Sequence, residues 1–193
     1  MSRATDPEAR AALRRDLLNK RRTWWNNAAQ REAADEALSQ LLWPVLQQLE
    51  PGCLGVYWPL PGEFNPKALA LQAREVLGCT LALPRAQREP AAMHYQLWDG
   101  NEPASRDDHG IACADGAPVT PDVVLVPCVG HTRAAYRLGY GGGYFDRYLA
   151  THPEVVALGL SWEGGELSSE ELTPGKHDIP LMAVFTPHAI WSD

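Results

Sequence analysis

The chain has 193 residues, 45% of them hydrophobic, and this length and composition suit one domain, 1–193, with a substantial core. Its 17 basic and 24 acidic residues give a formal net charge of -7, which opposes binding to a nucleic acid backbone. No run of about 18 apolar residues could span a bilayer, and the first residues lack the apolar core of a signal peptide. We therefore expect a soluble, cytoplasmic, monomeric protein that binds neither nucleic acid nor membranes.

Two helices are predicted at the start of the chain. Asp6 and Pro7 supply a cap and a first-turn proline, and the leucines that follow recur at helical spacing, which predicts a helix over about 7–22. A second apolar stripe predicts a helix over about 27–49, bent at Pro44.

After residue 50 the pattern changes to short runs of β-branched and apolar residues bounded by turn residues, which predicts strands. Helical stretches separate some of them, so we expect one three-layer α/β/α domain, Rossmann-like, with a largely parallel central sheet and two preceding N-terminal helices. The predicted strands are 53–60, 80–86, 93–98, 122–129, 155–162 and 182–187, the helices are near 66–77 and 142–152, and the polar stretches 88–95 and 99–118 are expected to be surface loops or a flap over a cleft.

The four cysteines, Cys53, Cys79, Cys113 and Cys128, lie singly in or near apolar stretches. They lack the close pairing of zinc sites and redox motifs. Buried free thiols are therefore predicted.

The run RLGYGGGYFDRYL, residues 137–149, places four glycines beside charged and aromatic residues. It follows the predicted strand at 122–129, and in an α/β sheet ligands bind beyond the carboxyl ends of strands. Unpaired amides in a glycine loop and at a helix N-terminus favour an anion such as phosphate. The glycines alone suit a tightly packed turn equally well. Arg137 favours phosphate, because a guanidinium holds it through a planar fork.

Neither standard phosphate motif fits this run. It contains no lysine for a Walker loop, and Tyr144 occupies the last position of a dinucleotide fingerprint, where glycine or alanine is required.

The longer segment LVPCVGHTRAAYRLGYGGGYFDRYL, residues 125–149, resembles the signature of the 5-formyltetrahydrofolate cyclo-ligase family. Three further segments resemble the family in the expected order, so the resemblance covers nearly the whole chain. These segments are RAALRRDLL near the start, YWPLPGEFNPKAL after the first predicted strand, and KHDIPLMAVFTP near the end.

The resemblance implies a ligase that uses ATP and Mg²⁺ to cyclise 5-formyltetrahydrofolate to 5,10-methenyltetrahydrofolate, with release of ADP and phosphate. The formyl oxygen is a poor leaving group and is first phosphorylated by the γ-phosphate. The N10 amine then attacks the formyl carbon and phosphate departs. Such phosphoryl transfer asks a protein mainly for positioning and for neutralisation of charge.

The same resemblance implies a role for individual residues. Arg137 and Asp146 would be catalytic, and Asp146 would hold Mg²⁺ with Asp178 as a second carboxylate. The ATP-binding set would be Arg10, Arg14, Arg137, Leu138, Gly139, Tyr140, Gly141, Gly142, Gly143 and Tyr144, and the folate would contact Glu63, Trp58 and Tyr144.

Several of these residues also have a purely structural interpretation. Arg10 and Arg14 lie four apart and could belong to a solvated basic helix face. Glu63 could cap the helix that follows it, and Trp58 could pack in the core. Asp146 could lie on a solvated helix face without any ligand.

The chain departs from the family pattern in two loops that are expected to face the folate. His131 and Thr132 stand where the family usually has Phe-Asp, and a Glu-Pro pair is missing after Gly110 and Ile111. Two other functions therefore stay open. One is a related ATP-using enzyme that acts on another small amide or acid, and the other is a non-catalytic folate or nucleotide binder.

Overall fold

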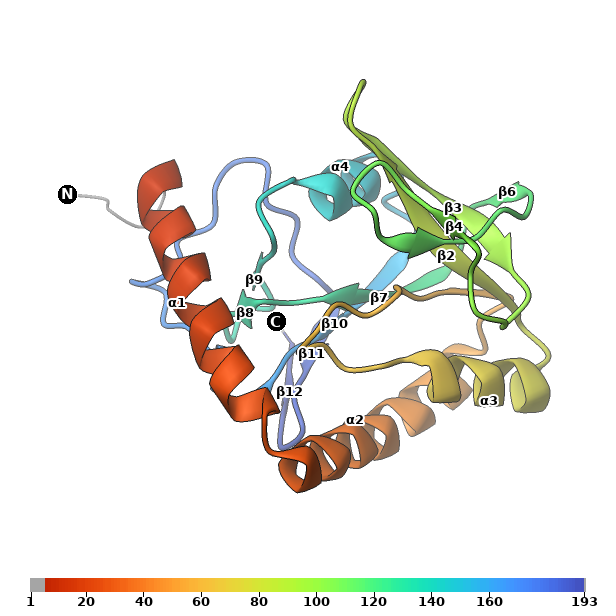
Figure 1. Cartoon of the computed structure of the whole chain (residues 1–193), viewed down its shortest axis with the longest axis horizontal. Coiled ribbons are helices and arrows are strands. Elements are labelled where there is room, and N and C mark those ends of the chain that lie inside the picture. Colours follow the sequence, from red (N-terminus) through yellow and green to blue (C-terminus); the bar gives the residue numbers. More distant parts are fainter. Residues whose placement is uncertain (1–5, 193) are drawn as a thin grey trace.

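The computed structural model describes residues 6–192, which form a mixed α/β fold around an eight-stranded sheet (Figure 1). The strand order is β12-β11-β10-β7-β1-β2-β3-β6. The helices are α1 (Pro7–Trp25), α2 (Ala28–Leu49), α3 (Lys67–Leu77) and α4 (Tyr144–Thr151), with a 3-10 turn at Glu163–Gly165. The sheet strands are β1 (Cys53–Gly55), β2 (Thr80–Gln87), β3 (Ala92–Trp98), β6 (Pro118–Val119), β7 (Val123–Pro127), β10 (Val156–Leu160), β11 (Ala183–Phe185) and β12 (Ile190–Trp191).

Five neighbouring strands, β2, β1, β7, β10 and β11, are mutually parallel. Counted by their order in the chain, they lie as 2-1-3-4-5, which is a doubly wound arrangement with its switch point between β1 and β7. The edges are antiparallel: β3 and β6 continue the sheet beyond β2, and β12 closes the other side.

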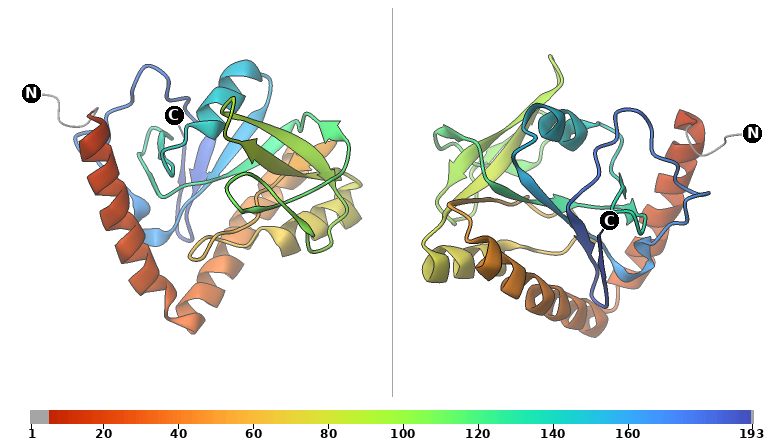
Figure 2. Two further views of the ribbon diagram at one scale, coloured as in Figure 1. Left: turned by 45° about the horizontal axis from the view of Figure 1, so that its top comes forward. Right: turned by 180° about the vertical axis from the view of Figure 1, so that it is seen from behind.

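Helices cover both faces of the sheet, as expected. Figure 1 shows α2 and α3 below the sheet and α4 above it, and Figure 2 shows the same layers from two further directions. Leu38, Leu42 and Leu46, one turn apart on α2, are buried against the lower face. Tyr148 and Leu149 of α4 pack on the upper face. The three-layer prediction is therefore confirmed.

The first helix stands beside the sheet, at the end where β7 and β10 finish. Its Leu17 packs with Val129 and Leu138, which follow β7, and with Trp162 and Leu167, which follow β10. This third apolar cluster fixes α1 against the loops that leave the carboxyl ends of the strands.

Most predicted elements are found close to their expected limits. The first helix runs to Trp25, three residues beyond the prediction, and the second begins after its cap residue Asn27 and continues through Pro44 to Leu49. The four cysteines are free and buried, as predicted. Within residues 6–192 no helix has the length and apolarity needed to cross a membrane.

The loop expected over 88–95 is limited to residues 88–91, because the predicted strand 93–98 is confirmed as β3, which begins at Ala92 and pairs with β2 along its whole length. The stretch 99–118 contains a short hairpin of β4 (Ser105–Arg106) and β5 (Ala112–Cys113). The polar composition of this stretch did not indicate strands, because their formation depends on pairing with a neighbouring strand and composition does not reveal that pairing.

Candidate functional site

Three loops meet beside the switch point, at the carboxyl ends of the parallel strands. Residues 56–66 follow β1, residues 128–143 follow β7, and residues 161–182 follow β10. The second loop includes a short hairpin of β8 (Gly130–His131) and β9 (Arg137–Leu138). Ligands of doubly wound sheets bind in the crevice at this position.

The glycine run links β9 to α4. Its place before a helix was predicted, whereas the β8–β9 hairpin between β7 and the run was not. Gly141 has φ +96° and Gly143, the residue before α4, has φ +65°, a conformation that favours glycine. Gly141 and Gly142 are exposed. The run therefore presents bare backbone and the amide end of a helix to solvent, which suits an anion. Leu138, by contrast, is buried in the core, so only its backbone could contact a nucleotide.

Two arginines of α1 reach this loop cluster. Arg14 Nε donates to the carbonyl oxygen of Gly139 at 2.6 Å, and Arg10 forms a salt bridge with Asp178 at 2.5 Å. Burial, and then the nearby charge of Arg10, lower the pKa of Arg14. The solvated-face interpretation of these arginines therefore does not describe the structure.

Arg137 lies under the glycine run rather than above it. Its side chain is 4% exposed, with Nη2 2.7 Å from Asp146 Oδ1 and Nη1 donating to the carbonyl oxygen of Ile179 at 3.0 Å. The Ile179 amide in turn donates to Asp146 Oδ1 at 3.2 Å. Arg137 thus provides a fixed positive charge. Nη1 is hydrogen-bonded, whereas Nη2 is ion-paired with Asp146 but has no hydrogen-bond partner among the described residues.

The two predicted metal ligands, Asp146 and Asp178, differ in whether they have a carboxylate oxygen without a protein partner. Asp146 uses Oδ1 for Arg137 and Ile179, and its side chain is 26% exposed. Asp178 uses both oxygens, since Arg10 and the Gly175 amide donate to them. Burial works against ionisation of Asp178, yet these hydrogen bonds outweigh it and lower its pKa.

These contacts give the two carboxylates different fits to Mg²⁺. Within the described residues no group of three or more His, Cys, Asp or Glu forms a metal cage. Mg²⁺ does not require one, because it commonly binds one or two carboxylates together with substrate phosphates. Asp146 fits that pattern, whereas Asp178 fits it only if Arg10 moves away.

A second cluster surrounds Glu63, which is 6% exposed in the loop after β1. Glu63 Oε2 accepts from the Leu60 amide at 2.7 Å, and Oε1 accepts from the Tyr140 hydroxyl. Arg21 Nη2 donates to the same hydroxyl at 2.6 Å. The helix after Glu63 receives no side-chain cap, so Glu63 is not a helix cap.

Burial raises the pKa of Glu63, against the opposing effects of Tyr140, the Leu60 amide and Arg21. Burial also raises the pKa of Tyr140, and the charge of Glu63 adds to the shift. The raised pKa of Tyr140 keeps its hydroxyl protonated, and this hydroxyl donates to Glu63. Sequence reasoning missed Arg21, because it lies 119 residues from Tyr140 along the chain.

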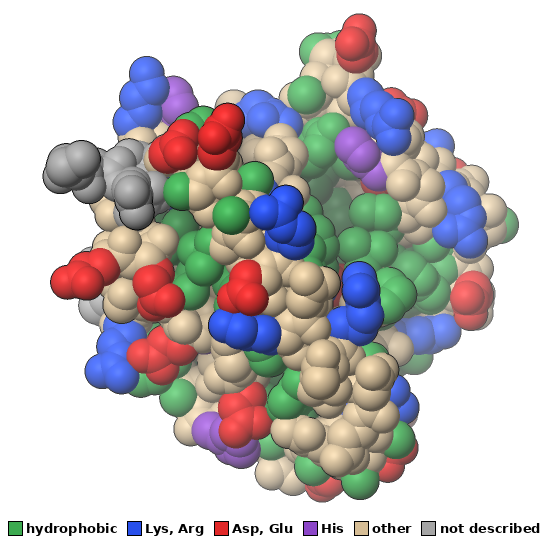
Figure 3. All heavy atoms as spheres, turned by 60° about the vertical axis from the view of Figure 1, so that its left-hand side comes forward, with side chains coloured by type: hydrophobic (Ala, Val, Ile, Leu, Met, Phe, Trp, Pro, Cys, Tyr) green, Lys and Arg blue, Asp and Glu red, His purple; other side chains and the backbone are tan. Residues whose placement is uncertain are grey.

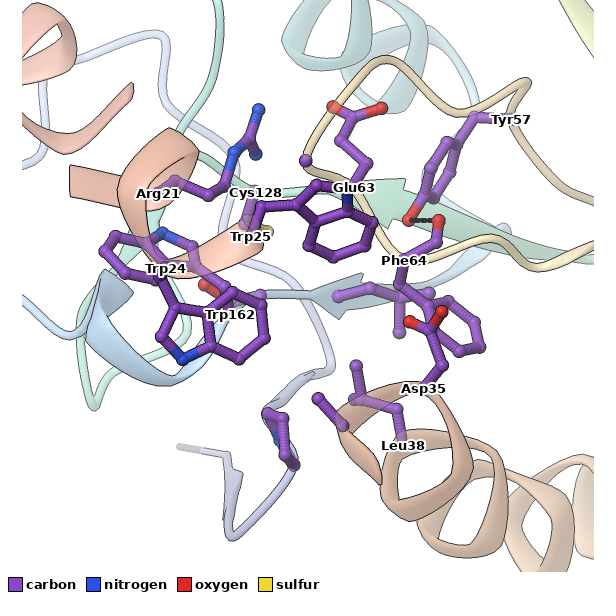
Figure 4. Close-up of a pocket in the computed structure, with 15 residues that line it drawn as sticks. Arg21, Trp24, Trp25, Asp35, Leu38, Tyr57, Glu63, Phe64, Cys128 and Trp162 are labelled. Atoms are coloured by element: carbon purple, nitrogen blue, oxygen red, sulfur yellow. Dashed lines mark hydrogen bonds between the residues drawn. The ribbon is translucent and has the colours of Figure 1, made fainter. Parts of the chain in front are cut away.

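Figure 4 shows Arg21 and Glu63 pointing their polar ends to the same side, away from an aromatic cavity behind them. This cavity has a volume of about 20 Å³, room for about one water, and the indoles of Trp24, Trp25 and Trp162 line it. Asp35 of α2 also lines it, and burial raises the pKa of that carboxyl to about 6.

The remaining predicted contact residues lie on either side of the glycine run. Tyr144 hydrogen-bonds through its hydroxyl to His109 Nε2 at 2.6 Å, which brings the β4–β5 turn to the start of α4. Trp58 packs edge-on against Trp98, with the Lys67 ammonium 5.8 Å from its ring. Figure 3 shows a hollow floored by hydrophobic side chains below the projecting β2–β3 hairpin, with basic side chains on its rim.

His131 and Thr132 do not face this hollow. His131 is 0% exposed and hydrogen-bonds through Nδ1 to Ser161 at 2.9 Å, and Thr132 is also buried. Burial lowers the pKa of His131 to about 4, so the imidazole is neutral at pH 7. The loop that carries these two residues is expected to face the folate, but both of these side chains are buried and neither lines the surface of the hollow.

Comparison with known proteins identifies the family. The sequence profile described as the 5-formyltetrahydrofolate cyclo-ligase family matches residues 6–187. The chain belongs to this family of ligases. The predicted resemblance is therefore confirmed.

Individual relatives agree with this assignment. A 5-formyltetrahydrofolate cyclo-ligase of Mycolicibacterium smegmatis is 28% identical over an alignment 194 positions long. The alignment covers 94% of this chain and 95% of the relative. A second, from Haemophilus influenzae, is 25% identical over 169 residues, covering 81% and 87%.

Solved structures support the fold. A 5,10-methenyltetrahydrofolate synthetase of Aquifex aeolicus has a TM-score of 0.77 at 22% identity and covers 95% of this chain and 92% of its own. The synthetase of Mycoplasma pneumoniae has a TM-score of 0.76 at 18% identity, covering 93% and 99%.

Asp35 generates a prediction about stability. Its pKa is about 6 in the folded protein and about 4 in an unfolded chain, so the folded state binds more protons between these values. The free energy of unfolding should therefore fall as pH rises from about 4 to about 6. Asp35→Asn removes this penalty and should stabilise the protein by about 1–2 kcal/mol at pH 8, after discounting for partial exposure.

Urea denaturation at pH 4 and pH 8 measures the effect. Glu36→Gln is the matched control, because Glu36 is the exposed neighbour of Asp35 on the same helix. Equal stabilisation by Asp35→Asn at both pH values would contradict the assignment of the penalty to the ionised carboxylate.

Proposed function

We propose that the protein uses ATP and Mg²⁺ to cyclise 5-formyltetrahydrofolate to 5,10-methenyltetrahydrofolate, releasing ADP and phosphate. The supporting observation is the convergence at one switch point of an exposed glycine run, two helical arginines and a buried carboxylate. We further propose that the chain acts as one cytoplasmic, monomeric domain that binds neither nucleic acid nor membrane. The eight-stranded sheet, which draws strands from both halves of the chain, supports the single domain.

The glycine run and α1 are proposed to hold the triphosphate. Amides of residues 139–143 would face the phosphate oxygens, and Arg14 lies directly beside Gly141. Arg10 is one helical turn away on the same face. Arg137, fixed beneath the run, would contribute its charge without leaving its own partners.

Asp146 is proposed to hold Mg²⁺ beside the phosphates, and Asp178 would join it as a second carboxylate after Arg10 turns to the nucleotide. The ion would neutralise charge that develops on the transferred phosphoryl group. The carboxylate of Asp146 keeps its position because Arg137 and the Ile179 amide hold one of its oxygens.

The folate is proposed to bind on the other side of the run, where Glu63 would pair with ring N–H groups of the pterin. Trp58 and Tyr144 offer aromatic faces for stacking. The departures at His131 and Thr132 do not argue for another substrate, because both side chains are buried away from the cleft.

An absorbance assay for the methenyl product tests the proposed reaction. Product should form only when 5-formyltetrahydrofolate, ATP and Mg²⁺ are all present. Asp146→Asn should lower turnover by about 10²-fold, because several kcal/mol of charge stabilisation depend on the metal. Glu166→Gln is the control, since it removes an exposed carboxylate that pairs with Arg133 outside the cleft.

Thermal unfolding of each variant accompanies this assay, because Asp146 also pairs with the buried Arg137. A folded Asp146→Asn protein with wild-type turnover would defeat the metal assignment. A wild-type protein that hydrolyses ATP without forming methenyl product would defeat the proposed substrate.

The glycine run generates a separate prediction for ATP affinity. Alanine at Gly141 would be strained at φ +96°, and its Cβ would lie 3.1 Å from the Arg14 guanidinium. A strain of about 1–3 kcal/mol should weaken binding of a non-hydrolysable ATP analogue about tenfold or more. Isothermal titration calorimetry measures this change.

Gly110→Ala provides the matched control. Gly110 has φ +78°, so alanine is strained there too, but its Cβ would meet nothing within 4 Å. Equal loss of ATP affinity in both variants would mean that the Gly141 effect is general destabilisation and not a property of the phosphate loop.

A further inference from the structure

Glu63, the carboxylate proposed to pair with the pterin, is already occupied in the ligand-free protein. One oxygen accepts from the Leu60 amide and the other from the Tyr140 hydroxyl, and only 6% of the residue is exposed. Each oxygen could accept a second hydrogen bond. Because so little of Glu63 is exposed, however, a ligand can reach the carboxylate only if one of these donors moves away. The Leu60 amide belongs to the same tight turn as Glu63, whereas Tyr140 is a side chain from another loop and is 41% exposed. Tyr140 is therefore the donor that can leave.

Tyr140 belongs to the glycine run, so its position depends on the proposed phosphate site. The carbonyl of Gly139, directly before it, accepts from Arg14 Nε at 2.6 Å. Gly141, directly after it, lies against the guanidinium of Arg14. Arg14 thus contacts the backbone on both sides of Tyr140. If Arg14 turns to bind phosphate, it releases the Gly139 carbonyl and with it the anchor of this segment.

We propose that Tyr140 is a latch that closes the folate site until nucleotide binds. In the ligand-free protein its hydroxyl occupies Glu63, and nucleotide binding at the glycine run and Arg14 withdraws it. This inference rests on the proposed function, because it assumes that phosphate and folate use these two groups. Tyr140 acts here as a positioning residue rather than as a catalytic one.

The latch also defines which ring edge can replace it. The Tyr140 hydroxyl donates to Glu63 and accepts from Arg21 Nη2 at 2.6 Å. Arg21 is 4% exposed, so loss of its acceptor would leave a buried donor unpaired, which is costly. The ligand must therefore bring a donor and an acceptor side by side. A cyclic amide, with N–H next to C=O, provides both on one edge, and a pterin contains such an amide.

Binding of the two ligands should therefore be linked. Nucleotide that opens the latch raises folate affinity, and by reciprocity folate raises nucleotide affinity by the same factor. A typical coupling between sites corresponds to about a tenfold change in affinity. Tyr140→Phe removes the hydroxyl and leaves the ring, so it should open the folate site without nucleotide.

The test measures the dissociation constant of 5-formyltetrahydrofolate by calorimetry, with and without Mg²⁺ and AMP-PNP. AMP-PNP is an ATP analogue that cannot transfer its terminal phosphate. For the wild-type protein, AMP-PNP should tighten folate binding about tenfold. For Tyr140→Phe, folate should bind without AMP-PNP as tightly as the wild type does with it, and the coupling factor should be near one. Tyr136→Phe, which removes a hydroxyl outside the Glu63 cluster, should behave as wild type.

The sign of the change separates the latch from a structural role. If the hydroxyl merely orients Glu63, Tyr140→Phe weakens folate binding, and the latch is overturned. Retention of wild-type coupling in the variant overturns it as well. Failure of the wild type to bind folate even with AMP-PNP would instead overturn the proposed function, and the latch would fall with it.

A second measurement follows the latch in the unmodified protein. With ¹³Cζ-labelled tyrosine, the Tyr140 resonance is assigned by its absence in Tyr140→Phe. AMP-PNP with Mg²⁺, without folate, should shift it by breaking the contact with Glu63. An unchanged resonance at saturating AMP-PNP would overturn the latch while leaving nucleotide binding established.

Discussion

The buried ion pair between Arg137 and Asp146 is the contact on which the site depends. Arg137 lies two residues before Gly139 and Asp146 three residues after Gly143, so their contact at 2.7 Å joins the two ends of the glycine loop. Ordering a run of glycines costs more conformational entropy than ordering other residues, and the ion pair offsets part of this cost by fixing both ends of the loop. The guanidinium is 4% exposed and also donates to the carbonyl of Ile179, so removing Asp146 would leave a buried charge without its ion-pair partner.

The ion pair also joins segments that the chain keeps far apart. Arg137 lies on β9, Asp146 on the first turn of α4, and Ile179 in the loop after β10. The neighbouring Asp178 carries the link on to α1 through Arg10. Two kinds of contact thus orient α1 across the strand ends. They are the salt bridge of Arg10 with Asp178 and the apolar contacts of Leu17.

Much of this arrangement could be predicted from sequence, because its signals are local. Leucines one turn apart gave the helices, the buried run at 123–127 gave the central strand β7, and the glycine run could be placed at a helix start. The antiparallel addition of β3 could not, since it depends on a register such as Leu81 opposite Trp98.

Side-chain partners were harder to predict than the elements that carry them. The contact of His109 with Tyr144 joins residues 35 positions apart, and neither residue type requires the other. The burial of His131 depends on Ser161, which follows a neighbouring strand, so a loop position suggested exposure where the structure has none. Arg137 was predicted to be a site residue, but its place beneath the loop depends on Ile179.

A protein of net charge -7 can still suit a polyphosphate, because only local charge acts over the roughly 8 Å that salt leaves unscreened. Arg10, Arg14 and Arg137 converge on one loop cluster, but each is already paired with an aspartate or a carbonyl. Binding an anion there would exchange some of these contacts, and it could also use Arg10 Nε and Arg137 Nη2, which are buried without a hydrogen-bond partner among the described residues. The free energy of anion binding is then smaller than the sum of the new contacts, because existing contacts are broken. The groups released from those contacts are free to move. In the proposed function, such an exchange would connect the glycine run with Glu63, since Arg14 donates to Gly139 and the hydroxyl of the next residue, Tyr140, donates to the carboxylate.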